Sequence, residues 1–320
     1  MNPKLQFTIT APSKAERFLQ MTETIYAWIR QDAMKQLISL FEGDAKKLDA
    51  PLKESLPYLE SFVKRWDFRA QKGGTERWAI ADNEFVKDHE AEILPQMKSL
   101  GLIGRTKPAF EPDFILPLGG ARRANLNRIQ MVRKILDEEE FTGKHIVALS
   151  GFRPLNGVEL PFISEYAPNA GTEFDAINGA IEIVFGVREY DEQKSYRENE
   201  NLCSAQRTYL TEYRNCQIVS LAAPSGDPGR RANSMDTFRQ FLRQFPIKAG
   251  QKILLVTSCI YVPYQLCRFQ ELALEGDFTV DCIGVSDDLL QGSPRSGAAS
   301  YLQETKATVD AISLLIQSYR

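Results

Sequence analysis

From Asp113 to the C-terminus, short apolar segments alternate with amphipathic segments of helical periodicity, and this alternation limits the folds open to the chain. Apolar runs bounded by turn residues are typical of buried strands. Strands that alternate with helices build a parallel sheet covered by helices on its faces. The sequence therefore predicts an α/β protein with a Rossmann-like, mainly parallel sheet flanked by helices.

The predicted elements follow from these periodicities. Strands are expected at residues 113–118, 145–150, 216–221, 252–257 and 279–284. Helices are expected at residues 121–137, 171–185, 199–213, 232–245, 262–275 and 298–318. Residues 181–187 are an alternative strand, and the polar stretch 190–201 is expected to be the start of a solvated helix or a flap.

The first 108 residues differ from the rest because their apolar residues recur at helical spacing throughout. Such spacing occurs in residues 16–31, 34–43, 52–66 and 84–102. Residues 104–113 contain two prolines and no periodicity, so they mark a boundary. We predict a helical N-terminal region at 1–108 and a Rossmann-like domain at 109–320.

The tryptophans of the helical region are predicted to form its core, as large aromatic side chains usually do. They are Trp28, Trp66 and Trp78. Segment 65–78 places three arginines and two tryptophans around a glycine pair. It is a candidate lid over a site in the following domain.

Charge and cysteine content narrow the class of protein. A net charge of −3 gives no general attraction to nucleic acid or to an anionic membrane. No apolar run approaches the roughly 20 residues that span a bilayer, and the N-terminus lacks the layout of a signal peptide. Five cysteines without a CxxC pair and two histidines favour reduced, buried thiols over a zinc site. We expect a cytoplasmic protein without nucleic-acid or membrane partners.

Polar residues and glycines cluster where the predicted strands end. In an open parallel sheet, loops that leave the carboxyl ends of the strands converge on one crevice, where ligands bind. Guanidinium groups in such a crevice favour phosphate or carboxylate, so an anionic small molecule is the expected partner. The predicted ligand-binding residues are Gly119, Gly120, Arg122, Ser150, Gly151, Arg153, Arg230, Arg231, Asn233, Thr257 and Ser258.

Each of these features has a structural alternative. The Gly119-Gly120 turn either brings backbone amides to an anion at a helix N-terminus or is a plain tight turn. The arginines either bind the ligand or are solvated and paired with acidic residues such as Asp227, Glu159 and Glu173. Thr257 and Ser258 either bind a phosphate or ribose or cap the next helix. The sequence fits neither GxGxxG nor a Walker loop, which argues against an ordinary dehydrogenase or P-loop protein.

Two acidic residues are the candidate catalytic groups. Glu173 or Asp236 is suited to act as a general base or to ligate a divalent ion. Asn233 and Asp236 alternatively cap a helix. The reaction expected is hydrolysis or group transfer at a phosphoryl, glycosyl or adenosyl centre. The alternative is a noncatalytic binding or regulatory protein that uses the same crevice.

Four segments together carry a resemblance to a known family. They are DFILPLGG at 113–120, ALSGF at 148–152 with GTEFDAINGA at 171–180, RRANSMDT at 230–237, and LLVTSCIYVPYQL at 254–266. Over about residues 113–318 the chain resembles the DUF218 (YdcF-like) domain family. The resemblance implies a Rossmann-like fold and a nucleotide-like or S-adenosylmethionine-like ligand. It makes S-adenosylmethionine, beside a divalent metal, a candidate cofactor.

The chain departs from that family after the Val-Thr-Ser strand. Where relatives carry histidine and arginine, this sequence has Tyr261 and Tyr264, and Phe152 replaces the second glycine of a Ser-Gly-Gly turn. A phenol with an ordinary pKa near 10 does not shuttle protons at neutral pH, but it stacks on bases and donates a hydrogen bond. Tyr261 and Tyr264 are therefore predicted to orient the ligand.

Overall fold

A computed structural model describes residues 5–7, 13–71, 80–286, 289 and 296–319. The chain forms two compact units, which are described separately. The first contains Met1–Arg105, Cys259–Glu275 and Arg295–Arg320, and the second contains Thr106–Ser258 and Gly276–Pro294. Two C-terminal segments thus belong to the unit of the helical N-terminal region. The domain division at 108–109 stays a prediction.

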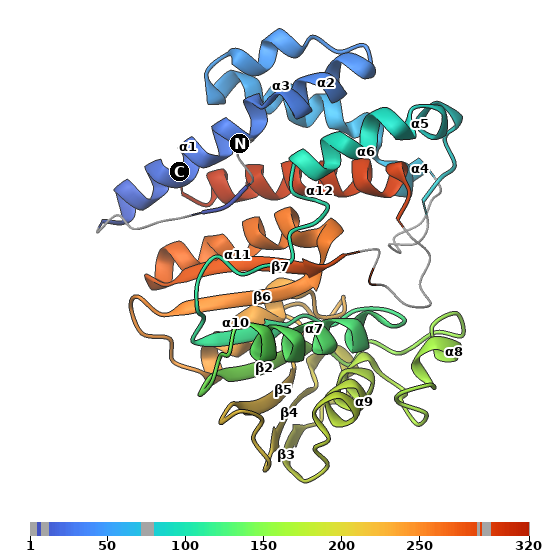
Figure 1. The fold of residues 1–320 in the computed structure, drawn as a ribbon, viewed down its shortest axis with the longest axis vertical. Helices are drawn as coiled ribbons and strands as arrows, with labels where there is room; N and C mark the ends of the chain where they lie inside the picture. Colours follow the sequence, from blue (N-terminus) through green and yellow to red (C-terminus); the bar gives the residue numbers. More distant parts are fainter. Residues whose placement is uncertain (1–4, 8–12, 72–79, 287–288, 290–295, 320) are drawn as a thin grey trace. The chain divides into compact units, whose positions relative to one another are not determined.

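The first unit is helical, as its periodicities predict. Its long C-terminal helix α12 packs against α3, α5 and α6 (red in Figure 1). The helices are α1 (Lys14–Arg30), α2 (Asp32–Leu40), α3 (Leu52–Val63), α4 (Phe68–Gln71), α5 (Glu84–Asp88), α6 (Glu90–Ser99), α11 (Val262–Gly276) and α12 (Ala298–Gln317), with the 3-10 helices η1 (Ala45–Asp49), η2 (Lys64–Trp66) and η4 (Cys259–Tyr261).

The core of this unit contains two of the three tryptophans. Trp28 and Trp66 are fully buried, and the Trp28 Nε1 donates a hydrogen bond to the Leu100 carbonyl at 3.0 Å. The core prediction is confirmed for these two residues, whereas Trp78 lies outside the described residues. Of the candidate lid 65–78, η2 and α4 are described and residues 72–79 are not, so the lid stays a prediction.

The second unit contains a seven-stranded sheet with the order β3-β4-β5-β2-β1-β6-β7. Strands β5, β2, β1, β6 and β7 are parallel, and β3 and β4 form an antiparallel hairpin at one edge. The chain is therefore a mixed α/β protein with a Rossmann-like sheet. The strands are β1 (Phe114–Pro117), β2 (His145–Ser150), β3 (Tyr190–Ser195), β4 (Ser204–Tyr209), β5 (Gln217–Ala222), β6 (Lys252–Ser258) and β7 (Thr279–Val285).

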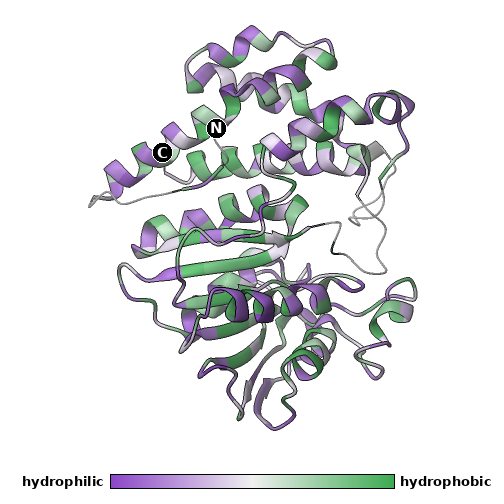
Figure 2. Ribbon diagram, viewed as in Figure 1, coloured by the Kyte–Doolittle hydropathy of each residue, from purple (hydrophilic) through white to green (hydrophobic). Residues whose placement is uncertain are grey.

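Helices cover both faces of this sheet because successive residues of a strand point to opposite sides. Helices α7 (Ala124–Glu138) and α9 (Glu173–Phe185) lie side by side on one face, over a core that includes Ile115 (Figure 1). Helix α10 (Ser234–Gln244) covers the other face, where the Phe241 ring packs edge-on against Phe114 with centroids 5.4 Å apart. Figure 2 draws the central parallel strands of this sheet mostly in the hydrophobic colour. Short helices α8 (Leu160–Ile163) and η3 (Glu200–Leu202) lie in the connections.

The hairpin β3–β4 corrects two predictions. The helix expected at 199–213 and the solvated helix or flap expected at 190–201 are wrong, because these residues form η3 and the two strands. Polar cross-strand contacts replace the apolar alternation that marks most strands. Arg207 donates to Glu192 at 2.9 Å and stacks on the Tyr190 ring, 3.8 Å from its centroid. The alternative strand at 181–187 is not formed, since α9 continues to Phe185.

Within the described residues, no helix combines the length and the apolar character that a bilayer crossing requires.

Candidate functional site

The strand order reverses direction at β1. From β1 the chain proceeds through β2 to β5 on one side, and then returns to β6 and β7 on the other. The carboxyl ends of β1 and β6 therefore form a topological switch point, the place where open α/β sheets bind ligands. Parallel pairing of Leu118 with Leu149 and of Pro117 with Val256 places Gly119, Ser150 and Ser258 at the same edge.

The Gly119-Gly120 turn has no backbone amide to offer. The Gly119 amide donates to the Leu149 carbonyl at 2.6 Å, and the Gly120 amide donates to the Asn125 Oδ1 at 2.8 Å. A Cβ on residue 119 would overlap the Glu173 Oε1, and a Cβ on residue 120 would lie 2.8 Å from the Arg128 Nη1. The glycines thus let a carboxylate and a guanidinium approach the turn.

Arg128 joins the ends of β1 and β6, and the sequence analysis did not identify it. Its side chain is buried, its Nη1 donates to the Leu118 and Gly119 carbonyls at 2.6 Å each, and its Nη2 donates to the Ser258 Oγ at 3.2 Å. Arg128, Val132 and Ile135 follow helical spacing on the buried stripe of α7. An arginine on the apolar face of a helix could have indicated this role in the sequence, because a buried charge requires specific partners.

Arg153 lies between two glutamates. Its Nη1 and Nη2 donate to Glu159 at 2.7 and 2.8 Å, and its Nε donates to the Glu173 Oε2 at 3.0 Å. Burial alone would lower the pKa of Arg153, but both carboxylates raise it, so the guanidinium stays charged. Burial raises the pKa of Glu159, but Arg153 and the Asn156 amide lower it by more than burial raises it. The pKa of Glu159 therefore lies below its usual range. Every nitrogen of this guanidinium is thus engaged with a carboxylate.

Glu173 is a fixed carboxylate with one available oxygen. It is the first residue of α9, after a capping box of Thr172 and Asp175, and its backbone amide donates to the Arg153 carbonyl at 2.9 Å. Arg153 occupies Oε2, while Oε1 faces Gly119 and accepts no hydrogen bond from the residues that the structure describes. The side chain is 16% exposed. Glu173 is therefore able to accept a proton or a hydrogen bond from a ligand.

Two arginines of the β1–α7 connection, the predicted Arg122 and its neighbour Arg123, contact the insertion that contains α8. Arg122 has a left-handed backbone with φ 52°, and its guanidinium lies over the Phe162 ring, 5.4 Å from the centroid. Arg123 forms an ion pair with Glu165, and the Tyr166 hydroxyl donates to the Arg122 carbonyl at 2.9 Å. These contacts hold the insertion beside the switch point.

Asp236 organises the loop that carries Arg230 and Arg231. Its carboxylate accepts hydrogen bonds from Arg230 at 2.5 Å, the Asn233 amide at 2.9 Å and the Gly226 amide at 3.0 Å. Asn233 in turn caps α10 through the Met235 amide at 2.9 Å. Burial raises the pKa of Asp236, but Arg230 and the amides lower it below its usual range. Both oxygens of Asp236 are occupied, and Asn233 serves as a helix cap.

The remaining predicted residues have mixed surroundings. The Ser150 Oγ donates to the Leu221 carbonyl at 3.1 Å, and Gly151 lies against Ala232 of the Asp236 loop. The Thr257 hydroxyl is buried and forms no hydrogen bond within the described part of the chain. Tyr261 and Tyr264 belong to η4 and α11 of the first unit, and their ligand role stays a prediction.

Groups of three or more acidic, histidine or cysteine side chains that would hold a metal ion are absent from the described residues.

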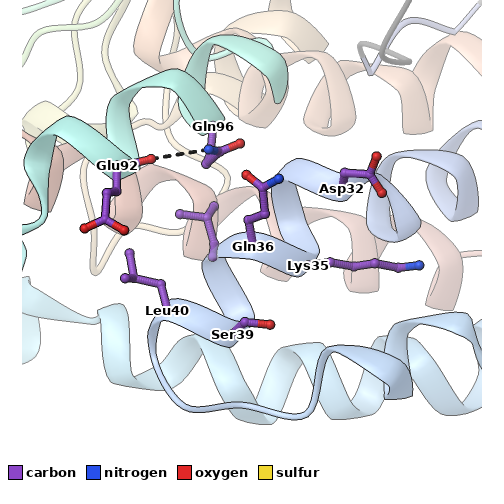
Figure 3. Close-up of a pocket in the computed structure, with 8 residues that line it drawn as sticks. Asp32, Lys35, Gln36, Ser39, Leu40, Glu92 and Gln96 are labelled. Carbon is purple, nitrogen blue, oxygen red and sulfur yellow. Dashed lines mark hydrogen bonds between the residues drawn. The ribbon is translucent and has the colours of Figure 1, made fainter.

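The first unit has a pocket of its own, between α2 and α6. It has a volume of about 580 Å³, and the Gln96 amide at its edge donates to the Glu92 carbonyl at 3.4 Å (Figure 3). Lys35 on its wall pairs with Asp49 at 2.6 Å. The walls mix acidic, basic, amide and leucine side chains, so they favour no single class of ligand.

The parallel sheet, whose strand order reverses at β1, and the charged residues at that point define a Rossmann-like α/β protein with a helical unit. Part of that helical unit, residues 13–101, matches the family model described as the Rv3785 N-terminal domain. The protein Rv3785 of Mycobacterium tuberculosis is 26% identical over 324 residues, which cover 92% of this chain and 89% of the relative. Mb3814 of Mycobacterium bovis has the same identity and coverage, and both relatives are described as uncharacterized. No solved structure matches the chain.

These comparisons overturn the resemblance to the DUF218 family. The matching family model and the relatives are of the Rv3785 type, and they extend into the N-terminal helices that the resemblance did not cover. The segments that suggested DUF218 have local causes in this fold. Gly119 and Gly120 make room for Glu173 and Arg128, and Thr257 and Ser258 end a buried parallel strand.

Proposed function

We propose that the chain is an enzyme that binds an anionic, nucleotide-like small molecule at the carboxyl ends of β1 and β6. The observation that carries the proposal is the position of Glu173. A carboxylate with one available oxygen lies at the switch point of a parallel sheet, the usual ligand site of this architecture. Hydrolysis or group transfer is the reaction class that this arrangement favours.

In this proposal Glu173 accepts the proton of the attacking group, which is water in hydrolysis or a substrate hydroxyl in transfer. Arg153 fixes the carboxylate, since the Nε contact of 3.0 Å and the buried Glu159 behind it restrict its rotation. Arg153 is thus a positioning residue, because each of its three nitrogens already donates to a carboxylate. A general base must lie within about 2.6–3.2 Å of the atom whose proton it removes. Within the described residues Oε1 accepts no hydrogen bond, so the proposal assigns this role to Oε1.

The anionic part of the ligand is assigned to the positive groups of the same edge. Arg128 brings a buried guanidinium to the end of β6, and the N-terminus of α7 contributes a partial positive charge. Arg122 adds a guanidinium supported by Phe162. Ser258, whose oxygen accepts from Arg128, keeps its hydroxyl proton available for a phosphate or ribose oxygen. S-adenosylmethionine remains a candidate for the bound molecule.

Noncatalytic binding at the same crevice is the second candidate, and one observation favours it. The other acidic side chains near this edge, Glu159 and Asp236, are occupied by arginines and amides. Glu173 would then bind a ligand hydroxyl or amine without transferring a proton.

A thermal-shift panel of nucleotides, S-adenosylmethionine and sugar phosphates tests the proposal. A ligand at 100 times its dissociation constant adds about 2.7 kcal/mol of stability. Glu173→Gln should weaken the shift or abolish turnover of the ligand found, whereas Glu138→Gln, far along α7, should change neither. The absence of any stabilising compound would refute the assignment to this edge, and so would a shift and a turnover in Glu173→Gln that both equal those of Glu138→Gln. If Glu173→Gln retained full turnover, Glu173 would not be the catalytic base, and only its role in ligand binding would stand.

A further inference from the structure

The sequence contains two Asn-Gly dipeptides, at residues 156–157 and 178–179. An asparagine before a glycine is prone to lose its side-chain amide, because glycine has no Cβ to shield the backbone nitrogen that attacks it. The two dipeptides have the same chemistry, so a difference in their reactivity must come from the fold. The first lies in the connection that contains α8, and the second lies inside α9 (Figure 1).

The side-chain carbonyl of Asn156 is polarised by backbone donors. Its Oδ1 accepts hydrogen bonds from the Val158 amide at 3.0 Å and from the Glu159 amide at 3.2 Å. Attack on the Asn156 Cγ would place negative charge on this oxygen, and preorganised donors stabilise such an oxyanion. The Asn156 amide in turn donates to the Glu159 Oε2 at 3.2 Å, which fixes the arrangement. The Cγ is therefore activated towards a nucleophile.

The Gly157 nitrogen is open to act as that nucleophile. Gly157 is exposed, and its amide donates no hydrogen bond to any residue that the structure describes. The carbonyl of the same peptide group, that of Asn156, accepts from the Glu159 amide at 3.0 Å and from the Leu160 amide at 3.2 Å. These hydrogen bonds stabilise the deprotonated peptide group, so they favour loss of the Gly157 amide proton.

The second dipeptide differs in its nucleophile. The Asn178 Oδ1 also accepts two hydrogen bonds, from the Ser220 hydroxyl at 2.6 Å and from the Tyr209 hydroxyl at 3.0 Å. Gly179, however, lies in the interior of α9, where the helical hydrogen-bond pattern engages its amide. Asn178 is also only 1% exposed. Ring closure there would break the helix, so Asn178 should be inert in the folded protein.

We propose that Asn156-Gly157 is a site of spontaneous covalent modification, at which the Gly157 nitrogen attacks the Asn156 Cγ. A bond forms between this nitrogen and Cγ, the bond from Cγ to Nδ2 breaks, and Nδ2 leaves as ammonia with the proton of the Gly157 amide. Water then adds to one of the two carbonyls of the resulting succinimide ring. Ring opening gives an aspartate, or an isoaspartate in which the backbone runs through the former side chain.

The isoaspartate form should disturb the neighbouring ion pair. It adds a methylene to the backbone between Arg153 and Glu159, which are joined at 2.7 Å. Glu159 is fully buried, so it has no free space in which to adjust. The modified protein should therefore unfold at a lower temperature than the unmodified protein.

Peptide mass spectrometry of protein incubated at neutral pH tests the proposal. In the native protein, Asn156 should convert at least about tenfold faster than Asn178, a barrier difference of about 1.4 kcal/mol. In urea the two rates should become similar, because the flanking residues are alike and the fold no longer distinguishes them. Equal rates in the native protein, an Asn156 that stays intact, or an unchanged preference for Asn156 in urea would each overturn the proposal.

Gly157→Ala is the matched variant. A Cβ on residue 157 meets no atom within 4 Å, so the fold should be retained, as circular dichroism would verify. The added methyl crowds the attacking nitrogen, and conversion of Asn156 should slow at least about tenfold. An unchanged rate in Gly157→Ala would show that the reaction does not pass through this nitrogen, and the proposal would fail.

Discussion

The Glu173 carboxylate occupies the space that a Cβ on residue 119 would fill, so Gly119 and Glu173 are sterically coupled. The coupling explains why a glycine follows β1 at this point. Gly119 meets the Oε1 of this carboxylate, and the Arg153 Nε donates to its Oε2 at 3.0 Å.

Gly119→Ala should destabilise the fold by about 1–3 kcal/mol, the usual cost of overpacking. Urea denaturation measures the loss. Gly151→Ala is the control, because its Cβ would lie an ordinary 3.7 Å from Ala232 and should cost little. Adding Glu173→Ala to Gly119→Ala should recover part of the loss. Equal effects of the two glycine substitutions would show that Glu173 does not constrain residue 119.

Glu159→Gln should cost about 3 kcal/mol at neutral pH, because it removes one partner of a buried ion pair. Glu165 is the control, because its ion pair with Arg123 is exposed on the Glu165 side. Glu165→Gln should change stability by less than about 1 kcal/mol. Denaturation of both variants beside wild type measures the difference.

The effect of Glu159 should depend on pH with a defined sign. Its pKa in the folded state lies below the ordinary value of 4.5, so its stabilisation is present above that pH. The stabilisation is lost as the pH falls through the folded-state pKa. The gap between wild type and Glu159→Gln should therefore narrow below pH 4.5. A gap that widens in acid would contradict the ion pair.

The contribution of Tyr319, in the first unit, to stability should depend on pH in the alkaline range. Burial raises the pKa of Tyr319 to about 12, and its ring stacks on Phe18 at 5.0 Å. A raised pKa stabilises the fold below the ordinary value of 10.0, and this contribution is lost as the pH rises toward about 12. The Tyr319 hydroxyl is buried and has no hydrogen-bond partner among the described residues. Tyr319→Phe should match wild type at neutral pH and exceed its stability above pH 10.0, as thermal denaturation would record. A variant that loses stability at neutral pH would reveal a hydrogen bond to the hydroxyl.

Asp236→Asn should destabilise the loop without affecting the proposed chemistry. The substitution weakens the capping box of α10, which is worth about 1 kcal/mol. Since Arg230 and two amides occupy the carboxylate, ligand turnover should be retained. Turnover and denaturation measured on one preparation separate the two effects. A loss of turnover by orders of magnitude with little loss of stability would make Asp236 catalytic.

The five parallel strands were predictable because each is an apolar run between turn residues. No observed strand end differs from its predicted position by more than one residue. The hairpin β3–β4 was not predictable in this way. Its strands are stabilised by contacts among Arg207, Glu192 and Tyr190. Because these side chains are mostly polar, the sequence does not show the alternation of apolar and polar residues that indicates a strand.

The site shows the same limit. Strand ends located Gly119, Ser150 and Ser258 at one edge, as parallel pairing requires. The partners of Arg153 could not be chosen from the sequence, because Glu159 and Glu173 are brought together only by the insertion and the start of α9. Arg128 was missed because a helical arginine is usually exposed, and its carbonyl acceptors come from the end of another element.

The central claim is that Glu173 contacts a small-molecule ligand at the switch point. Native mass spectrometry of freshly purified protein tests it most directly. Wild type and the control Glu138→Ala should carry the same bound small molecule, and Glu173→Ala should carry little or none. A ligand retained in full by Glu173→Ala, with the variant folded as judged by circular dichroism, would contradict the claim.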